Sequence, residues 1–299
     1  MKKLFVLLLL TAALFVTPVF ADTSDPTTGD PTTGDPTTGE EQQPYVITVS
    51  SADELSKVLS SEPGANVPVI VQFTEGTVVS DSIYVPYNVT LDLNGGTLNG
   101  YVDLEGDNSS IINGTINKGG ISVRSNDSGG TISGMTIKNA PGMSIEIRGG
   151  KIGDITDNTI TGSKDHAIRL YGDAVAGDIT GNTITDCKGD GVSVYNGSHC
   201  GKISGNTLKN IGDNSGDDDY GITINSHGSG YTYAKEITRN TVDTTTFAAI
   251  VVHSAAKGHE SSKDQDKGYV KGDIAYNTVK NACTYLKNKE CQAAIYVDS

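Results

Sequence analysis

A phrase of nine residues recurs along the second half of this chain and limits its fold more than any other feature. It reads DITGNTITD from Asp178 to Asp186 and KISGNTLKN from Lys202 to Asn210. Related phrases carry an asparagine at the same point of each copy, at Asn158, Asn182, Asn206, Asn240 and Asn277. Weaker copies lie upstream, around Gly96, Gly114 and Met135. A period of about 24 residues that lengthens by insertion is typical of a solenoid, in which each repeat packs on its neighbours.

A second phrase recurs between the copies of the first. Examples are GISVRS from Gly120, AIRLYG from Ala167 and GVSVYN from Gly191. Apolar residues alternate with variable ones in each copy, which is the pattern of a β-strand with one buried face. Each repeat therefore predicts three short strands. Each strand would stack parallel on its counterpart in the preceding repeat, about 4.8 Å away.

Together these phrases resemble the PbH1-type repeats of the pectate-lyase-like superfamily. The resemblance covers roughly residues 46–299 and implies an all-β fold, a single-stranded right-handed parallel β-helix solenoid. It also implies that the five asparagines form an internal ladder at a tight turn. Asparagine tolerates the left-handed backbone of such a turn, and its amide can bond to the copies above and below. We therefore interpret these asparagines as structural.

The first 44 residues differ in composition from the repeats. Residues 1–21 combine two lysines, an apolar run too short to span a membrane and a small-residue end, which predicts a secretory signal peptide. Residues 22–44 contain three DPTTG repeats and predict a disordered linker. Residues 45–299 remain for the β-helix domain, either complete or C-terminally incomplete. We expect the protein to be secreted or held at the cell surface.

Both ends of the coil carry a signal. Ser51 is followed three residues later by Glu54, which is a capping box at the start of a helix. The apolar residues of this segment fall on one helical face: Leu55, Val58 and Leu59. We expect this short helix to cap the N-terminal end. The chain stops at QAAIYVDS, the start of a further rung. A truncated family member, end-to-end self-association and a loop folded over this end are the alternatives.

Charge and cysteine content narrow the possible partners. The net charge is −14, which argues against nucleic acid as a partner. No segment after the leader is apolar enough to span a membrane. Cys283 and Cys291 bracket a short insertion, and a disulfide between them is predicted. Cys187 and Cys200 flank one strand on opposite sides, and we expect them not to be paired with each other.

The variable positions of the second phrase are expected to face solvent and to form a long shallow groove, walled by the longer loops. The first outward position of successive rungs is occupied by Ser122, Glu146, Arg169, Ser193, Thr223, Val251 and Tyr296. The second is occupied by Arg124, Arg148, Tyr171, Tyr195, Asn225, His253 and Asp298. Tyrosine and arginine at this spacing suit sugar rings and their carboxylates, so we predict a polysaccharide partner that contains uronate. The alternative is that Glu146, Arg148 and Arg169 neutralise one another.

Uronate lyases and epimerases need a cation on the sugar carboxylate and a base near the adjacent carbon. The candidates for these catalytic roles are Asp165, His166, Arg169 and Tyr171. The candidates for substrate binding are Glu146, Arg148, Asp190, Tyr195, Tyr220, Asn225 and His253. A glycoside hydrolase would use two carboxylates, such as Glu146 with Asp165 or Asp190, and is the less favoured enzyme.

The sequence predicts no metal site with a recognisable ligand pattern. The acidic run 217–219 could hold Ca²⁺ on one loop or simply be solvated, and the histidines lack the spacing of a zinc site. The catalytic motifs of polygalacturonases, mannuronan epimerases and pectate lyases are not matched residue by residue. Two classes of function remain open. One is an enzyme acting on an acidic polysaccharide, and the other is a non-catalytic surface or adhesion module that binds a glycan or a protein.

Overall fold

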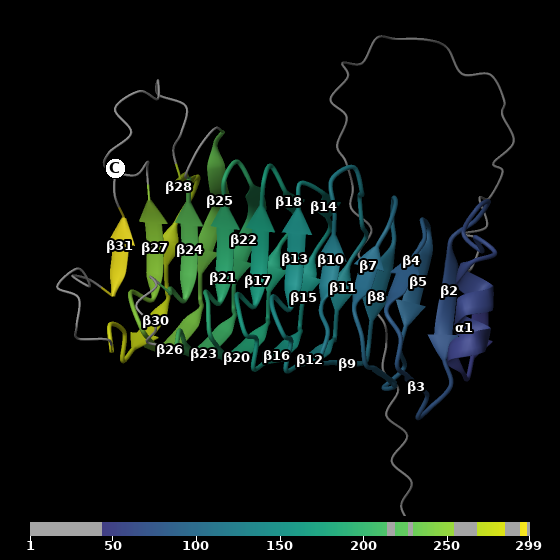
Figure 1. The fold of residues 1–299 in the computed structure, drawn as a ribbon. Coiled ribbons are helices and arrows are strands. Elements are labelled where there is room, and N and C mark those ends of the chain that lie inside the picture. Colours follow the sequence, from purple (N-terminus) through teal and green to yellow (C-terminus); the bar gives the residue numbers. More distant parts are fainter. Residues whose placement is uncertain (1–43, 214–218, 227–229, 254–267, 285–293, 298–299) are drawn as a thin grey trace, which may run out of the picture. The chain divides into compact units, whose positions relative to one another are not determined.

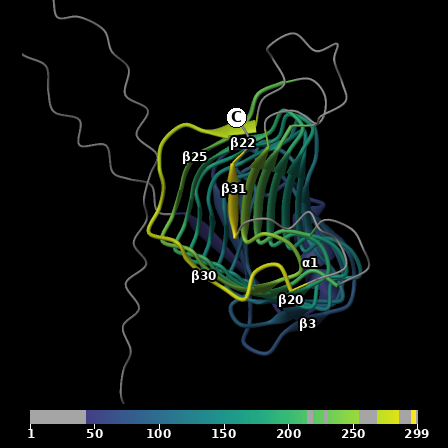
Figure 2. The same cartoon turned by 90° about the vertical axis from the view of Figure 1, so that its left-hand side faces the viewer.

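The computed structural model describes residues 44–213, 219–226, 230–253, 268–284 and 294–297. From residue 43 onward the chain forms one compact unit, a coil of short parallel strands. Three sheets run along it (Figure 1), and they form the three sides of the coil when it is viewed along its axis (Figure 2). The predicted all-β solenoid is therefore confirmed.

The first sheet contains thirteen strands among the described residues. They are β1 (Tyr45–Val49), β2 (Val69–Phe73), β5 (Val89–Asp92), β8 (Ser110–Ile112), β11 (Ile132–Ser133), β14 (Lys151–Ile152), β15 (Ile155–Thr156), β18 (Val175–Ala176), β19 (Ile179–Thr180), β22 (His199–Ser204), β25 (Thr232–Thr238), β28 (Gly268–Val270) and β29 (Ile274–Ala275).

The second and third sheets contain nine strands each in the same part of the chain. The second consists of β4 (Ile83–Val85), β7 (Val102–Leu104), β10 (Ile121–Val123), β13 (Ile145–Arg148), β17 (Ile168–Tyr171), β21 (Val192–Tyr195), β24 (Ile222–Asn225), β27 (Ile250–His253) and β31 (Ile295–Val297). The third consists of β3 (Val78–Val79), β6 (Thr97–Leu98), β9 (Thr115–Asn117), β12 (Thr136–Lys138), β16 (Thr159–Thr161), β20 (Thr183–Cys187), β23 (Thr207–Ile211), β26 (Thr241–Thr245) and β30 (Thr278–Lys280).

The core consists of aliphatic side chains stacked in register from rung to rung. In the third sheet Ile160 pairs with Ile184, which pairs with Leu208, and all three are fully buried. The period-2 pattern of each strand explains this arrangement, because alternate side chains enter the coil and the others point outward. Burial of these side chains stabilises the coil by about 25 cal/mol for each Å² of apolar surface removed from water.

The asparagines form a continuous internal ladder. The Oδ1 atom of Asn182 accepts hydrogen bonds from the backbone N–H and the Nδ2 of Asn158, each at 3.0 Å. The Nδ2 of Asn182 donates to the carbonyl of Ile155 at 2.9 Å and to Oδ1 of Asn206 at 3.0 Å. The same pattern continues through the two later asparagines of the ladder. Each rung is thus tied to the next through a buried amide.

One detail of the predicted turn is wrong. The ladder asparagines do not adopt the left-handed backbone. The residue before each of them does, with φ values between 55° and 68°: Asp157, Gly181, Gly205, Arg239 and Tyr276. The reason is that the left-handed residue reverses the chain direction, which leaves the following asparagine in a position to point inward. Asparagine is selected at this point for its amide and not for its backbone freedom.

Helix α1 (Ala52–Leu59) lies at the N-terminal end of the coil beside β2 (Figure 1). Ser51 caps it by accepting a hydrogen bond from the Glu54 N–H at 3.2 Å. The Glu54 carboxylate accepts from the N–H and hydroxyl of Ser50, and not from Ser51 as a standard capping box would require. Leu55 and Leu59 join the core, so the predicted capping helix is confirmed.

At the other end, β31 pairs with β27. Its side chains Ile295 and Val297 are 40% and 54% exposed. Self-association through this end stays a prediction. Among the described residues, no helix is long and apolar enough to cross a membrane.

Candidate functional site

The outer face of the second sheet brings the predicted site residues into two columns. Because the strands are parallel and in register, equivalent positions of successive rungs lie side by side. The first column from β13 to β27 contains Glu146, Arg169, Ser193, Thr223 and Val251. The second contains Arg148, Tyr171, Tyr195, Asn225 and His253.

Exposure divides the first column. Glu146 and Arg169 are half-buried, whereas Ser193, Thr223 and Val251 are only 3%, 2% and 1% exposed. The expectation that all of these positions face solvent is therefore wrong for the first-column positions of β21, β24 and β27. The side chains still point outward, but other groups cover them.

Tyr220 supplies part of this cover. Its ring contacts Phe247, just before β27, and His253, at the end of β27, with both ring centroids 6.1 Å away. It therefore lies across the strand that carries Val251. The sequence pattern could not reveal this contact, because it joins two rungs through a side chain that precedes its own strand.

The arginines of this face are not neutralised by Glu146. Within the described part of the chain, neither Arg148 nor Arg169 has a carboxylate within 4.0 Å. The Nε atom of Arg169 is buried and has no hydrogen-bond partner among those residues. The alternative of mutually neutralised neighbours is therefore not what the structure contains.

The guanidinium of Arg169 lies instead against two tyrosines. It is 5.0 Å from the ring centroid of Tyr171 and 5.8 Å from that of Tyr195. The two rings stack on each other, with centroids 5.8 Å apart and an angle of 13° between their planes. One face of each ring is thus already occupied, which leaves less ring surface for a sugar than the sequence suggested. The rings and the cation form one packed group.

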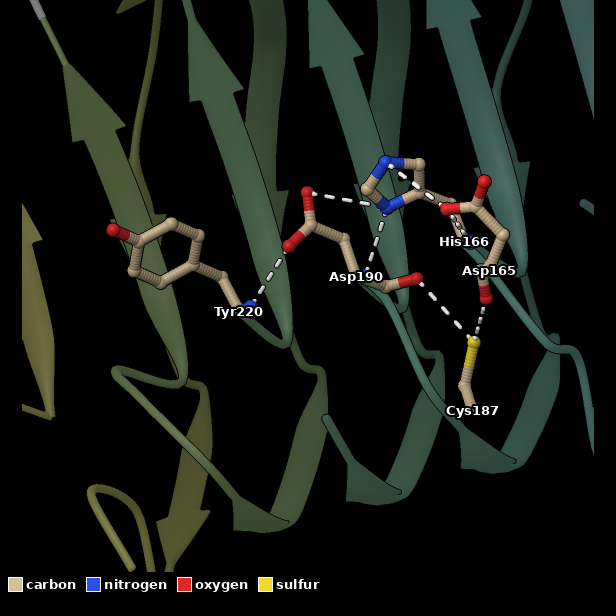
Figure 3. A network of polar contacts seen from close by, with 5 residues as sticks. All are labelled: Asp165, His166, Cys187, Asp190 and Tyr220. Atoms are coloured by element: carbon tan, nitrogen blue, oxygen red, sulfur yellow. Dashed lines mark hydrogen bonds and ion pairs between the residues drawn. The ribbon is translucent and has the colours of Figure 1, made fainter. Parts of the chain in front are cut away.

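A polar network precedes these strands and links three rungs (Figure 3). The Nδ1 atom of His166 accepts a hydrogen bond from the Asp190 N–H at 2.8 Å. His166 Nε2 is 3.5 Å from Asp165 Oδ1, and His166 Nδ1 is 3.6 Å from Asp190 Oδ2. Asp190 Oδ1 accepts from the Tyr220 N–H at 2.8 Å. The imidazole therefore lies between two carboxyl groups.

Cys187 supports the network through its thiol. The sulfur lies 2.9 Å from the carbonyl oxygen of Asp165 and 3.5 Å from that of Asp190. Burial raises the pKa of this thiol to about 12, so it is not a nucleophile at neutral pH. The thiol thus contacts the backbone of both segments that carry the carboxyl groups of the network.

Burial sets the ionisation of the network. It raises the pKa of Asp190 to about 7, and the negative charge of Asp219 adds to the rise. Hydrogen bonds from Tyr220 and Ser193 and the positive charge of Arg169 oppose the rise. Burial also lowers the pKa of His166 to about 4, against the attraction of Asp165. At neutral pH the imidazole is uncharged and the Asp190 carboxyl is divided between its two forms.

The hydrogen bonds support this assignment independently. Because His166 Nδ1 accepts from a backbone N–H, it carries a lone pair and no proton. That lone pair lies near Asp190 Oδ2, and it would repel a carboxylate more than a carboxylic acid. The site therefore holds a carboxyl group that can give or take a proton near pH 7, which is what general acid–base chemistry requires.

Three residues that the sequence analysis named for other reasons also belong to this network or lie beside it. Ser193 bonds to the Asp190 carboxyl, Thr223 has a buried hydroxyl oxygen without a hydrogen-bond partner among the described residues, and Asp219 lies close enough to influence Asp190. Alternation placed Ser193 and Thr223 on the outer face, but no local signal indicated that they would be buried there.

Several predictions fall outside the described residues. They concern Asp217, Asp218, Asp298, Cys291 and the long insertion before β28. Cys283 is disulfide-bonded, while Cys187 and Cys200 are free and buried. Among the described residues, no group of three acidic, histidine or cysteine side chains is placed to hold a metal ion.

Comparisons with known proteins identify a family with this architecture. The family model described as "Right handed beta helix region" matches residues 89–242. A search of curated proteins found no match. Solved structures with a similar course include catalytic domains of a GH87 α-1,3-glucanase. A variant in complex with nigerose has a TM-score of 0.37 at 13% identity, and another in complex with tetrasaccharides has 0.29 at 12%. In both cases the match covers 89% of this chain and 70% of the other. Such low scores give no basis for inferring a shared activity.

Proposed function

The chain belongs to the right-handed β-helix family, and we propose that it binds an acidic polysaccharide on the outer face of the second sheet. We propose further that it acts on this polymer by proton transfer at Asp190, in the manner of a lyase or an epimerase. The signal-peptide pattern of residues 1–21 supports a secreted or surface-held protein that meets such polymers outside the cell.

One observation carries the proposal. Arg169 is a half-buried cation without a carboxylate within 4.0 Å in the described residues, and its Nε has no hydrogen-bond partner there. This occurs in a chain whose net charge is −14. Removing a cation from water is costly unless an anion pairs with it. A carboxylate of the ligand would supply that anion, and arginine suits it because its planar donors can bond both oxygens.

The arrangement also supports a polymer as the ligand. The two columns continue over five strands in register, from β13 to β27. The second column remains at least partly exposed over all five strands and offers guanidinium, phenol, amide and imidazole groups, all of which bond to sugars. An extended row of this kind fits successive sugar units of a chain better than a single small molecule.

Proton transfer next to a uronate carboxyl requires the carboxylate to be neutralised and a group of suitable pKa to be close. Arg169 would serve the first role. Asp190, whose pKa burial raises to about 7, would serve the second, with His166 holding it in position. A hydrolase would need a second carboxylate at a defined separation, for which Asp165 is the candidate. A non-catalytic binding module is the alternative, because binding alone needs only Arg169 and the tyrosines.

The test uses the full-length protein with polygalacturonate and alginate as acidic polymers and dextran as the neutral control. We expect binding to the acidic polymers alone, measured by calorimetry, and at least a tenfold loss in Arg169→Gln. Lys209→Ala is the matched control, because it removes an exposed positive charge from β23 on the third sheet. Equal binding of acidic and neutral polymers, or unchanged binding by Arg169→Gln, would sink the proposal.

The same incubations separate the enzyme from the binding module. Unsaturated uronate ends detected by ultraviolet absorbance would identify a lyase, and a changed ratio of uronate epimers in proton NMR would identify an epimerase. New reducing ends without unsaturation would point to hydrolysis. Binding with none of these products after long incubation would establish the non-catalytic alternative.

A further inference from the structure

We propose that Asp190 is the specificity-determining residue of this face: by keeping a proton it leaves Arg169 without an internal counter-ion, and binding of an acidic sugar is coupled to that proton. This inference rests on the proposed function and adds to it a reason why the site would select acidic over neutral sugars. It also assigns this buried carboxyl a role in binding that is separate from proton transfer to the polymer.

The first step concerns the environment of the Asp190 side chain, which is only 6% exposed. Its Oδ1 accepts from the Tyr220 N–H at 2.8 Å. Its Oδ2 lies 3.6 Å from His166 Nδ1, which accepts from the Asp190 N–H and so has no proton to offer. A carboxylate in this position would face a lone pair, whereas a carboxylic acid would not. The unprotonated His166 Nδ1 and the burial of the carboxyl therefore favour the protonated form, against the hydrogen bond from Tyr220, which favours the carboxylate.

The second step concerns the charges that face this carboxyl from each neighbouring element. Arg169 on β17 favours ionisation, and Asp219 in the segment before β24 opposes it. From β21, the hydroxyl of Ser193 bonds to it. His166 is uncharged at neutral pH, because burial lowers its pKa to about 4, and Asp165 contacts the far side of that ring. In the described part of the chain Arg169 is thus the cation that lowers the pKa of Asp190, and the loss of hydration on burial raises this pKa by more.

The third step is a thermodynamic linkage between the ligand and the proton. Below pH 7 Asp190 is mostly neutral, and Arg169 keeps its full attraction for an external anion. Above pH 7 Asp190 is ionised and compensates Arg169 internally. A bound sugar carboxylate adds negative charge near Arg169, which disfavours ionised Asp190 and raises its pKa. Acidic sugars should therefore bind with uptake of a proton near pH 7, and neutral sugars should not.

Calorimetry can measure this proton directly. Polygalacturonate oligomers are titrated into the full-length protein at pH 7 in two buffers that differ in ionisation enthalpy. We expect uptake of a fraction of a proton for each bound site. If binding raises the pKa of Asp190 by about one unit, the affinity should fall about fivefold from pH 6 to pH 8, within a total change of about tenfold over the whole titration. Asp190→Asn should abolish the proton uptake and flatten the pH dependence.

Asp186→Asn is the matched control. It removes the same charge from β20, where Asp186 is exposed and accepts a hydrogen bond from Asn210 at 2.9 Å. An asparagine oxygen can accept the same bond. We expect this variant to keep the proton uptake and the pH dependence of the wild type.

A second measurement does not depend on any variant. The carboxyl carbon of Asp190 is followed by NMR in the labelled wild-type protein, with and without the oligomers. We expect a midpoint near pH 7 in the free protein and a higher midpoint in the complex.

The outcomes distinguish the two proposals. Failure of the wild type to bind acidic oligomers at either pH would overturn the proposed function and this inference with it. Binding without proton uptake, an unchanged Asp190 midpoint in the complex, or uptake that persists in Asp190→Asn would overturn the inference alone and leave the binding face in place.

Discussion

Replacing Asn206 with alanine tests whether the buried amides hold the coil together. The Asn206 side chain is fully buried and makes four hydrogen bonds of 2.8–3.0 Å. Alanine would leave three groups without this partner: the N–H and one Nδ2 hydrogen of Asn182, and the carbonyl of Ile179. Each buried group that loses its partner costs about 1–3 kcal/mol. We therefore expect Asn206→Ala to lower the free energy of unfolding by at least about 3 kcal/mol.

The assay is equilibrium denaturation in urea, with the slope of the transition checked for a constant value so that midpoints can be compared. Asn117→Ala is the matched control. Asn117 is half-buried on the third sheet, and its Nδ2 donates to Asn99 Oδ1 at 3.1 Å. Its loss should cost no more than about 1 kcal/mol. Similar losses in the two variants would refute the reasoning, because the internal position would then confer no advantage over the external one.

Three further changes test other parts of the structure. Burial raises the pKa of Asp190, so the folded protein holds a proton between pH 4 and 7 that the unfolded chain releases, and the contribution of Asp190 to stability falls as the pH rises. Burial lowers the pKa of His166, so between about pH 4 and 6.5 the unfolded chain holds a proton that the folded protein lacks, and the contribution of His166 to stability increases with pH. The two slopes oppose each other, so Asp190→Asn should leave stability rising from pH 4 to 6.5, and a flat or falling profile from thermal melts would contradict this. Gly181→Ala should destabilise by about 1 kcal/mol or more, because φ is +68° and the added carbon would meet the Asp157 side chain, whereas Gly142→Ala, which has open space, should be nearly neutral in the same melts. Cys187 should resist a thiol reagent in the native protein and react after denaturation, as followed by peptide mass spectrometry; rapid native labelling would show that the thiol is not buried.

The fold could be predicted from the sequence because every rung repeats the same short sequence pattern. The alternation in GVSVY and the amide at Asn182 each act over one or two rungs, so they can be read from short stretches. The left-handed residue was placed one position too late, since the asparagine was the conspicuous member of the turn. Backbone angle and side-chain bonding belong to different residues there, and a single sequence does not separate them.

The candidate site was predicted less completely for a physical reason. The columns that contain Arg169 and Tyr195 follow from register, which the repeats define. Burial at Thr223 and the contact between His166 and Asp190 depend on how side chains of different rungs fold over the outer face. No periodicity encodes such contacts, because each rung contributes a different residue to them. The protonation of Asp190 follows from that burial and is equally hidden.

The ladder has a consequence for how a molecule of this kind can change over generations. Along the ladder, Asn182 bonds to the asparagines directly before and after it, and Asn206 does the same. The joint between one turn and the next is therefore nearly interchangeable along this stretch. Duplication or deletion of the segment between Asn182 and Asn206 would reproduce a joint that already exists. Length would then be an inheritable quantity that varies in whole units, while the outer columns gain or lose one position on each occasion. A binding face matched in length to a longer or shorter ligand could arise in a single genetic event, without any change in the packing of the core.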